Sequence, residues 1–277
     1  MTEKAWGQIY ASEDSTQGLS SQELLGTYNT YRKLRKVIGI LGMSLPVLLV
    51  VLAPLLKSWH EGVPIHWELE NSISAYYYTK AGGLFVGTLF AIGVLLLSYN
   101  YRVVDTIMTT IACGLAITVA LCPTPEFNGQ VNLLGILHYV GASGLFFTFG
   151  YMALLRFTIS DVDPSDVNWQ NRRKLYRACG TVIFAMLSVA LVLWVVERLT
   201  GTELVLPVVN NNWLFWVEVV MVEAFGLSWL VKGGFYFFGP LKALWAPPLR
   251  AGETSPSDAV RHRLPGLRLI DDPAKRS

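Results

Sequence analysis

The sequence predicts an all-α membrane protein, a polytopic transmembrane helical bundle of six spans with both termini in the cytoplasm. Hydrophobic residues make up 52% of the 277 residues and charged residues only 15%, whereas soluble globular chains are roughly 25% charged. Six long runs are almost free of charge, and lysines and arginines gather on one side of them. The net charge of +2 is too small to indicate a nucleic-acid partner, and the sequence has no basic stripe interleaved with aromatic residues.

Each of the six runs is long enough to cross the membrane as one helix. The hydrocarbon core is about 30 Å thick, and a helix is required because lipid offers backbone amides and carbonyls no hydrogen-bond partners. Pro46 and Pro54 are expected to kink the first span, because proline lacks an amide hydrogen. The expected spans are residues 37–56, 81–101, 106–125, 127–155, 178–196 and 213–231.

Polar segments flank the bundle at both ends of the chain. Residues 1–36 are predicted to form a cytoplasmic tail that ends in an amphipathic lead-in helix lying at the interface, opened by a Ser20/Glu23 capping box. Residues 37–245 are predicted to form the six-span bundle with an interfacial C-terminal segment. Residues 246–277 combine proline, serine and mixed charge, which predicts a disordered cytoplasmic tail.

The distribution of basic residues predicts the orientation. Cytoplasmic connections carry an excess of lysine and arginine, and thirteen of these residues lie near the spans on one side but only three on the other. Both termini are therefore expected in the cytoplasm, and the connection between the first two spans is expected to face outward. The three on the outer side are Lys57, Lys80 and Arg198.

That outer connection, residues 63–80, is the most polar stretch between the spans and is predicted to cover an outward-facing pocket. It carries a histidine, two glutamates, two serines and three tyrosines. Ionisable groups inside a span cost roughly 2.5–3.5 kcal/mol each, so they are candidates for function. The candidate pocket residues are His66, Glu70, Ser72, Ser74 and Tyr77 from the connection, with His138, Glu218 and Glu223 from the spans.

Two of these groups are expected to meet in the outer half of the membrane. At 1.5 Å per residue, His138 lies about 10 Å and Glu218 about 7 Å inside the outer ends of their spans. A hydrogen bond between them would satisfy both, and a double-mutant cycle would then be non-additive. Glu223 lies about 140° around the helix from Glu218. The alternative for His138 is a place in a packing face with Gly135, Gly141 and Gly144.

The outer connection also allows two chemical alternatives. His66 and Glu70 share a side in either a helix or a strand, but a metal would need a third ligand, and no histidine or cysteine cluster is present. We therefore predict no metal and no cofactor. Ser72 and Ser74 lack the G-x-S-x-G context of a nucleophile, and helix capping before the second span is the expected role. Asp105 is likewise expected to cap the third span.

Four stretches together resemble a known group of membrane proteins. They are S-I-S-A-Y-Y-Y-T at 72–79, F-V-G-T-L-F-A-I-G-V-L-L-L-S-Y at 85–99, I-L-H-Y-V at 136–140 and F-G-L-S-W-L-V-K-G at 225–233. The group is one of bacterial six-span membrane proteins of unknown function, related to DRAM-like and PGAP-type lipid-remodelling proteins. The chain departs from the alkaline-ceramidase pattern, because His138 is its one histidine within a span and that pattern needs three around zinc.

The sequence predicts a protein of the bacterial inner membrane whose partners are membrane lipids. The first hypothesis is a non-catalytic or accessory protein that binds a lipid headgroup or a small polar solute in the outer pocket. The second is a lipid-modifying hydrolase or transferase, with His138 as general base and Glu218 or Glu70 orienting it. A transporter or channel is the third. A homo-oligomer is compatible with the sequence.

The predicted orientation can be tested by labelling in intact cells. Cysteines introduced at Glu61 and Asn128 should react with a membrane-impermeant thiol reagent, because both positions lie in outer connections. A cysteine at Ser165 should not react, and labelling there would reverse the orientation.

Overall fold

The fold is an all-helical bundle. The structure, a computed structural model, describes residues 21–99, 102–124, 132–159, 167–200 and 212–234. Within these ranges there are six α-helices and no strand, with a five-residue 3₁₀ helix η1 (Ser74–Tyr78) and a π-helical turn η2 (Met152–Arg156). The α-helices are α2 (Ser21–Glu61), α3 (Gly82–Leu97), α4 (Val103–Leu121), α5 (Leu133–Tyr151), α6 (Val167–Thr200) and α7 (Trp213–Lys232).

The helices have the length and composition of a multi-pass membrane protein. Five described segments are long and apolar enough to cross a membrane, namely those of α2, α4, α5 with η2, α6 and α7. The remaining helix, α3, is apolar but has only 16 residues, about 24 Å at 1.5 Å per residue. The sixth span and the side on which the termini lie therefore stay predictions.

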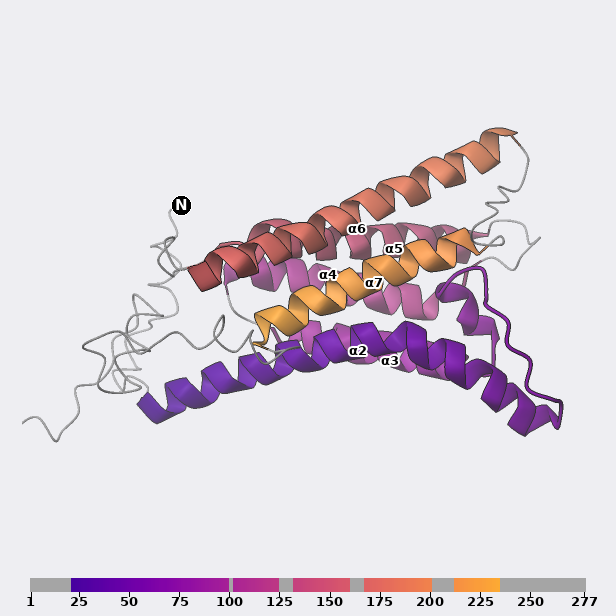
Figure 1. The fold of residues 1–277 in the computed structure, drawn as a ribbon, viewed down its shortest axis with the longest axis horizontal. Coiled ribbons are helices and arrows are strands. Elements are labelled where there is room, and N and C mark those ends of the chain that lie inside the picture. The colour runs from indigo at the N-terminus through magenta and orange to yellow at the C-terminus, as the bar shows by residue number, and fades with distance from the viewer. Residues whose placement is uncertain (1–20, 100–101, 125–131, 160–166, 201–211, 235–277) are drawn as a thin grey trace, which may run out of the picture.

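The predicted lead-in helix and first span form one continuous helix. α2 runs for 41 residues and includes both Pro46 and Pro54. It is visibly bowed (Figure 1), as expected where proline removes a hydrogen bond from the helix. Residues 21–36 thus extend the span itself instead of forming a separate interfacial helix. The tail 246–277, the interfacial segment before it and the labelling positions Asn128 and Ser165 lie outside the described residues.

The six helices form a closed ring. Each helix packs against the next one along the chain from α2 to α6, and α7 packs between α6 and α2. Figure 1 shows α7 running between those two long helices. Aromatic and aliphatic side chains fill the interior, including the stacked pair Phe149 and Phe225 with ring centroids 3.8 Å apart. The first and last described helices are therefore neighbours, although they are far apart in the sequence.

Glycines bring α2 and α7 into backbone contact. A Cβ atom on Gly39 would lie 2.7 Å from the carbonyl oxygen of Gly226, and one on Gly226 would lie 2.8 Å from that of Gly39. Such close approach is typical of membrane helices joined through small residues. A side chain at either position would force the two backbones apart.

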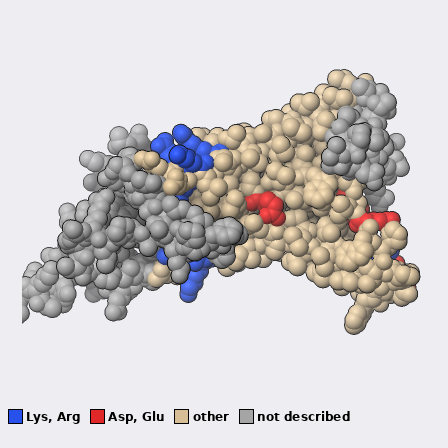
Figure 2. Space-filling view, in the orientation of Figure 1, with Lys and Arg blue, Asp and Glu red and all other residues tan. Residues whose placement is uncertain are grey.

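The two ends of the bundle differ in charge. Lysines and arginines gather toward one end, and the long middle section is almost uncharged (Figure 2). We call the end that holds the N-terminal part of α2 and the C-terminal end of α7 the basic end, and the opposite end, which holds residues 62–81, the loop end. The charge distribution agrees with the asymmetry on which the predicted orientation depends.

Changing Gly226 to alanine should destabilise the bundle. The new methyl group would meet backbone atoms of α2 that cannot move without separating the helices, and such overpacking typically costs about 1–3 kcal/mol. Thermal unfolding of the detergent-solubilised protein measures the effect. The matched control is Gly114→Ala in α4, where a Cβ meets no atom within 4 Å. Equal melting temperatures for the two variants would contradict the close contact.

Candidate functional site

The connection at the loop end is tied to the first turn of α7. The Phe215 backbone amide donates to the carbonyl oxygen of Asn71 at 3.0 Å, and the Asn212 side-chain amide donates to the carbonyl oxygen of Leu69 at 3.1 Å. The first backbone amides of a helix have no partner within the helix. In α7 one of them, that of Phe215, is satisfied by the Asn71 carbonyl from the connection. This anchoring places η1 across the loop end of the bundle.

Glu218 provides the third tie. Its Oε2 atom accepts a hydrogen bond of 2.6 Å from the Ile73 backbone amide, and the Ser74 amide also acts on this carboxylate. Ile73 immediately precedes η1. A carboxylate is thus held inside the bundle by backbone donors, which offset the cost of removing it from water.

Capping side chains shape the rest of the connection. Ser72 Oγ accepts from the Ala75 amide at 3.0 Å, so this serine supports η1 and not the start of the second span, where the sequence predicts its capping role. At the start of α3 the corresponding residue is Thr79, whose hydroxyl accepts from the Ala81 amide at 3.1 Å and donates to the Tyr76 carbonyl. Ser74 is buried and faces the interior.

A narrow cavity lies beneath η1. Its volume is about 50 Å³. Glu218 and Ser74 are the polar side chains among its lining residues, and all the others are apolar. The predicted polar pocket is therefore an apolar cavity with a polar group at one end. The lining residues are Gly42, Leu45, Ile73, Ser74, Phe85, Leu89, Ile92, Val119, Ala142, Leu145, Phe146, Phe149, Glu218, Val222 and Phe225.

His138 does not line this cavity, and its partner is not Glu218. Its Nδ1 atom lies 2.6 Å from the carbonyl oxygen of Cys122, the C-cap residue that follows α4. Since a carbonyl only accepts, Nδ1 carries the proton in this contact. The ring is 3% exposed. The expected hydrogen bond to Glu218 is wrong, because each group instead satisfies a backbone atom at a helix end.

The remaining candidates in the connection lie outside the cavity. His66 Nδ1 lies 3.4 Å from Glu68 Oε1, with side chains 81% and 78% exposed, so the contact of His66 is with Glu68 and not with Glu70. Burial raises the pKa of the half-buried Glu70, and the Glu68 charge raises it further while Lys57 lowers it. Tyr77 is half-buried and packs edge to face on Tyr78, with centroids 5.3 Å apart. None of these side chains lines the cavity.

Glu223 occupies a different surface of α7 from Glu218. It lies about halfway along the helix, is partly exposed and does not line the cavity. Figure 2 shows acidic atoms in the middle of the otherwise uncharged surface. The expected angular separation from Glu218 agrees with this arrangement.

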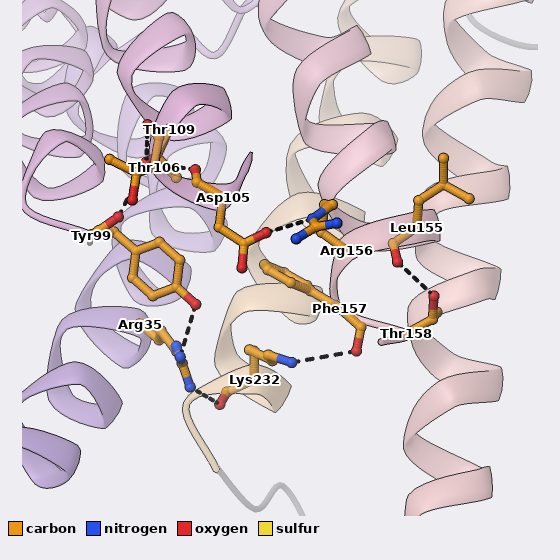
Figure 3. A network of polar contacts seen from close by, with 10 residues as sticks. All are labelled: Arg35, Tyr99, Asp105, Thr106, Thr109, Leu155, Arg156, Phe157, Thr158 and Lys232. Atoms are coloured by element: carbon orange, nitrogen blue, oxygen red, sulfur yellow. Dashed lines mark hydrogen bonds and ion pairs between the residues drawn. The ribbon is translucent and has the colours of Figure 1, made fainter. Parts of the chain in front are cut away.

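Sequence reasoning missed a second polar centre, at the basic end (Figure 3). Asp105 accepts from Arg156 Nε at 2.6 Å, with side chains 8% and 14% exposed. Asp105 therefore pairs with the π-helical turn η2 instead of capping α4 with its side chain. Arg35 donates to the Tyr99 hydroxyl at 2.8 Å. The sequence predicts a helix cap at Asp105 and marks Arg35 and Arg156 only as charges that indicate orientation.

The described side chains form no cluster of potential metal ligands. No group of three or more histidine, cysteine, aspartate or glutamate side chains among them is placed to hold a metal. His138, proposed as a general base, contacts the Cys122 carbonyl, whereas Glu218 accepts from the Ile73 amide. Comparison with protein-family models, with curated proteins and with solved structures finds no match to this chain. Function must therefore be argued from the site.

Substitutions at His138 and Glu218 should be additive. Each removes a separate hydrogen bond to backbone, to Cys122 and to Ile73 respectively, and each should lower the unfolding free energy by about 1–3 kcal/mol. Glutamine at 218 and asparagine at 138 keep polar groups, so alanine is the informative replacement. A double-mutant cycle by thermal unfolding should close within about 0.5 kcal/mol. A larger coupling energy would restore the His138–Glu218 pair.

Proposed function

We propose that this protein binds a lipid-like amphiphile in the cavity at the loop end, as a non-catalytic or accessory membrane protein. The observation that supports this most directly is the lining, which is apolar except for Ser74 and the Glu218 carboxylate. An apolar chain replaces water in such a cavity at a gain in free energy. A small polar solute would find too few partners there.

The carboxylate defines the kind of head group that fits. A carboxylate accepts about four hydrogen bonds, and the Ile73 and Ser74 amides use two of them. The remaining capacity favours a donor, either a hydroxyl or an ammonium group. A phosphate or carboxylate head would be repelled by Glu218. The ligand class is therefore an amphiphile with a hydroxyl or ammonium head and a slender apolar chain, of which the cavity of about 50 Å³ holds only the part next to the head.

The location of the cavity is consistent with a ligand from the membrane. With the predicted orientation, the loop end faces outward, and the ligand would enter from the outer leaflet of the bacterial inner membrane. The lipid-modifying activity considered above has no support from the described residues, because no nucleophile and base contact each other at this cavity. Binding is therefore the proposed activity.

A series of ligands that share one chain tests the head-group preference. Dodecylamine, dodecanol and dodecanoate would be added to the protein in phosphatidylcholine nanodiscs, and the melting temperature recorded. The first two should stabilise the protein, and dodecanoate should not. Ala142→Phe fills the cavity and should abolish the effect, whereas Ala91→Phe, on the exposed face of α3, should preserve it.

Two results would contradict the proposal. One is equal stabilisation by all three ligands, which would indicate partitioning into the bilayer or onto the protein surface. The other is an undiminished response in Ala142→Phe, which would place the binding elsewhere. Glu218→Gln separates the roles of charge and hydrogen bonding, because glutamine can still accept from the Ile73 amide but carries no charge. This variant should show a smaller preference for the ammonium head.

A further inference from the structure

One carboxyl group on the surface of the bundle has no partner within the described residues. Glu223 stands about halfway along α7, roughly 15 Å from each end of the helix at 1.5 Å per residue. Its side chain is partly exposed, and no charged or hydrogen-bonding group of the described chain reaches its carboxyl. Glu223 is therefore a polar group near the middle of a span whose hydrogen-bonding capacity is unused.

Lipid tails cannot satisfy this carboxyl group. Hydrocarbon offers neither donors nor acceptors, so ionisable residues within spans almost always face the bundle interior, a water-filled cavity or another polar group. Glu218 on the same helix follows this rule, because it accepts from the Ile73 amide inside the bundle. Glu223 does not line the cavity. Its position on the outer surface is suited to a polar group from another molecule.

Glu223 belongs to an exposed stripe of α7. Trp216 and Val220 are 46% and 40% exposed, and spacings of four and three residues keep the three side chains within roughly 60° around the helix. The same spacings bring side chains together where two helices pack along a seam. α7 packs on α2 and α6 at its sides, and Figure 1 shows it running between them. We call Trp216, Val220 and Glu223 the outer stripe.

A second copy of the chain would bring a matching group to the same depth. Copies that insert with the same orientation are related by a two-fold axis along the membrane normal, and a residue at such an axis meets its own counterpart. A protonated carboxyl group both donates and accepts, so two Glu223 side chains can satisfy each other. A different membrane protein would need a polar group of its own at this depth.

From this arrangement we propose that the outer stripe is the interface of a homodimer, in which the two Glu223 carboxyl groups hydrogen-bond to each other across a two-fold axis. Trp216 and Val220 of each copy pack beside this pair, and the two α7 helices run parallel. Polar pairs strengthen helix association in lipid, where apolar side chains have no hydrophobic driving force to associate. The interface lies outside the bundle, so it does not depend on the ligand proposed for the cavity.

Disulfide cross-linking of the full-length protein in native membranes tests where two copies meet. A disulfide joins cysteines whose Cα atoms lie within about 7 Å, so Val220→Cys should give a covalent dimer when copper phenanthroline is added. Ile111→Cys is the matched control and should stay monomeric. Ile111 is 45% exposed near the middle of α4, the helix opposite α7 in the ring. The native cysteines are buried.

Changes at Glu223 test the carboxyl pair itself. Energy transfer between dye-labelled copies in phosphatidylcholine vesicles measures the dissociation constant of the dimer. Glu223→Leu should weaken the dimer roughly tenfold, the loss expected for one polar pair in lipid. Glu223→Gln still donates and accepts and should keep most of the affinity. The control Ser188→Ala should match the wild type, because this exposed hydroxyl on α6 already donates to the Phe184 carbonyl.

Several results would overturn the proposal. A cross-linked product of Val220→Cys whose mass is not twice that of the chain would assign the outer stripe to another membrane protein. The absence of any product would assign it to lipid, and equal yields from Val220→Cys and Ile111→Cys would indicate random collision. Equal dissociation constants for the wild type and Glu223→Leu would remove the carboxyl pair. The cross-link needs no change at Glu223, so it decides the interface even if Glu223→Leu fails to fold.

Discussion

The backbone contact between α2 and α7 is the constraint on which the rest of the bundle depends. Gly39 and Gly226 let the two helices approach until side chains no longer separate them. The ring of six helices closes at this contact. Because α2 and α7 lie side by side, the connection that follows α2 reaches the start of α7. For the same reason, Arg32 and Arg35 in the first half of α2 reach the C-terminal end of α7.

Polar side chains inside the bundle mostly complete the hydrogen bonding of helix ends. At the basic end, Arg32 and Arg35 donate to the carbonyls of Gly233 and Lys232, where a helix has unsatisfied carbonyls and a partial negative charge. Near the loop end, His138 does the same for Cys122, and Glu218 accepts from Ile73. Inside a membrane, water is not available to bond these helix-end amides and carbonyls. The side-chain hydrogen bonds therefore have a structural role, even for Glu218, which also borders the cavity.

The cavity at the loop end takes its character from the hydrogen-bonding capacity that remains after these bonds are made. There the Glu218 carboxylate, which still has acceptor capacity, borders an apolar cavity. At the basic end, Asp105 and Arg156 already pair with each other. The apolar middle of the bundle separates these two environments.

The sequence by itself determined the helical class, most helix positions and the charged asymmetry, because the length and hydropathy of a span are local properties. It could not determine partners. His138 and Glu218 lie at similar depth, but depth along a helix says nothing about which neighbour each side chain faces. Asp105 resembled a helix cap until η2 brought Arg156 beside it. Helix rotation and neighbour choice follow from long-range packing, above all from the contact at Gly39 and Gly226, so only the tertiary structure decided where the cavity forms and which charged residues meet at the basic end.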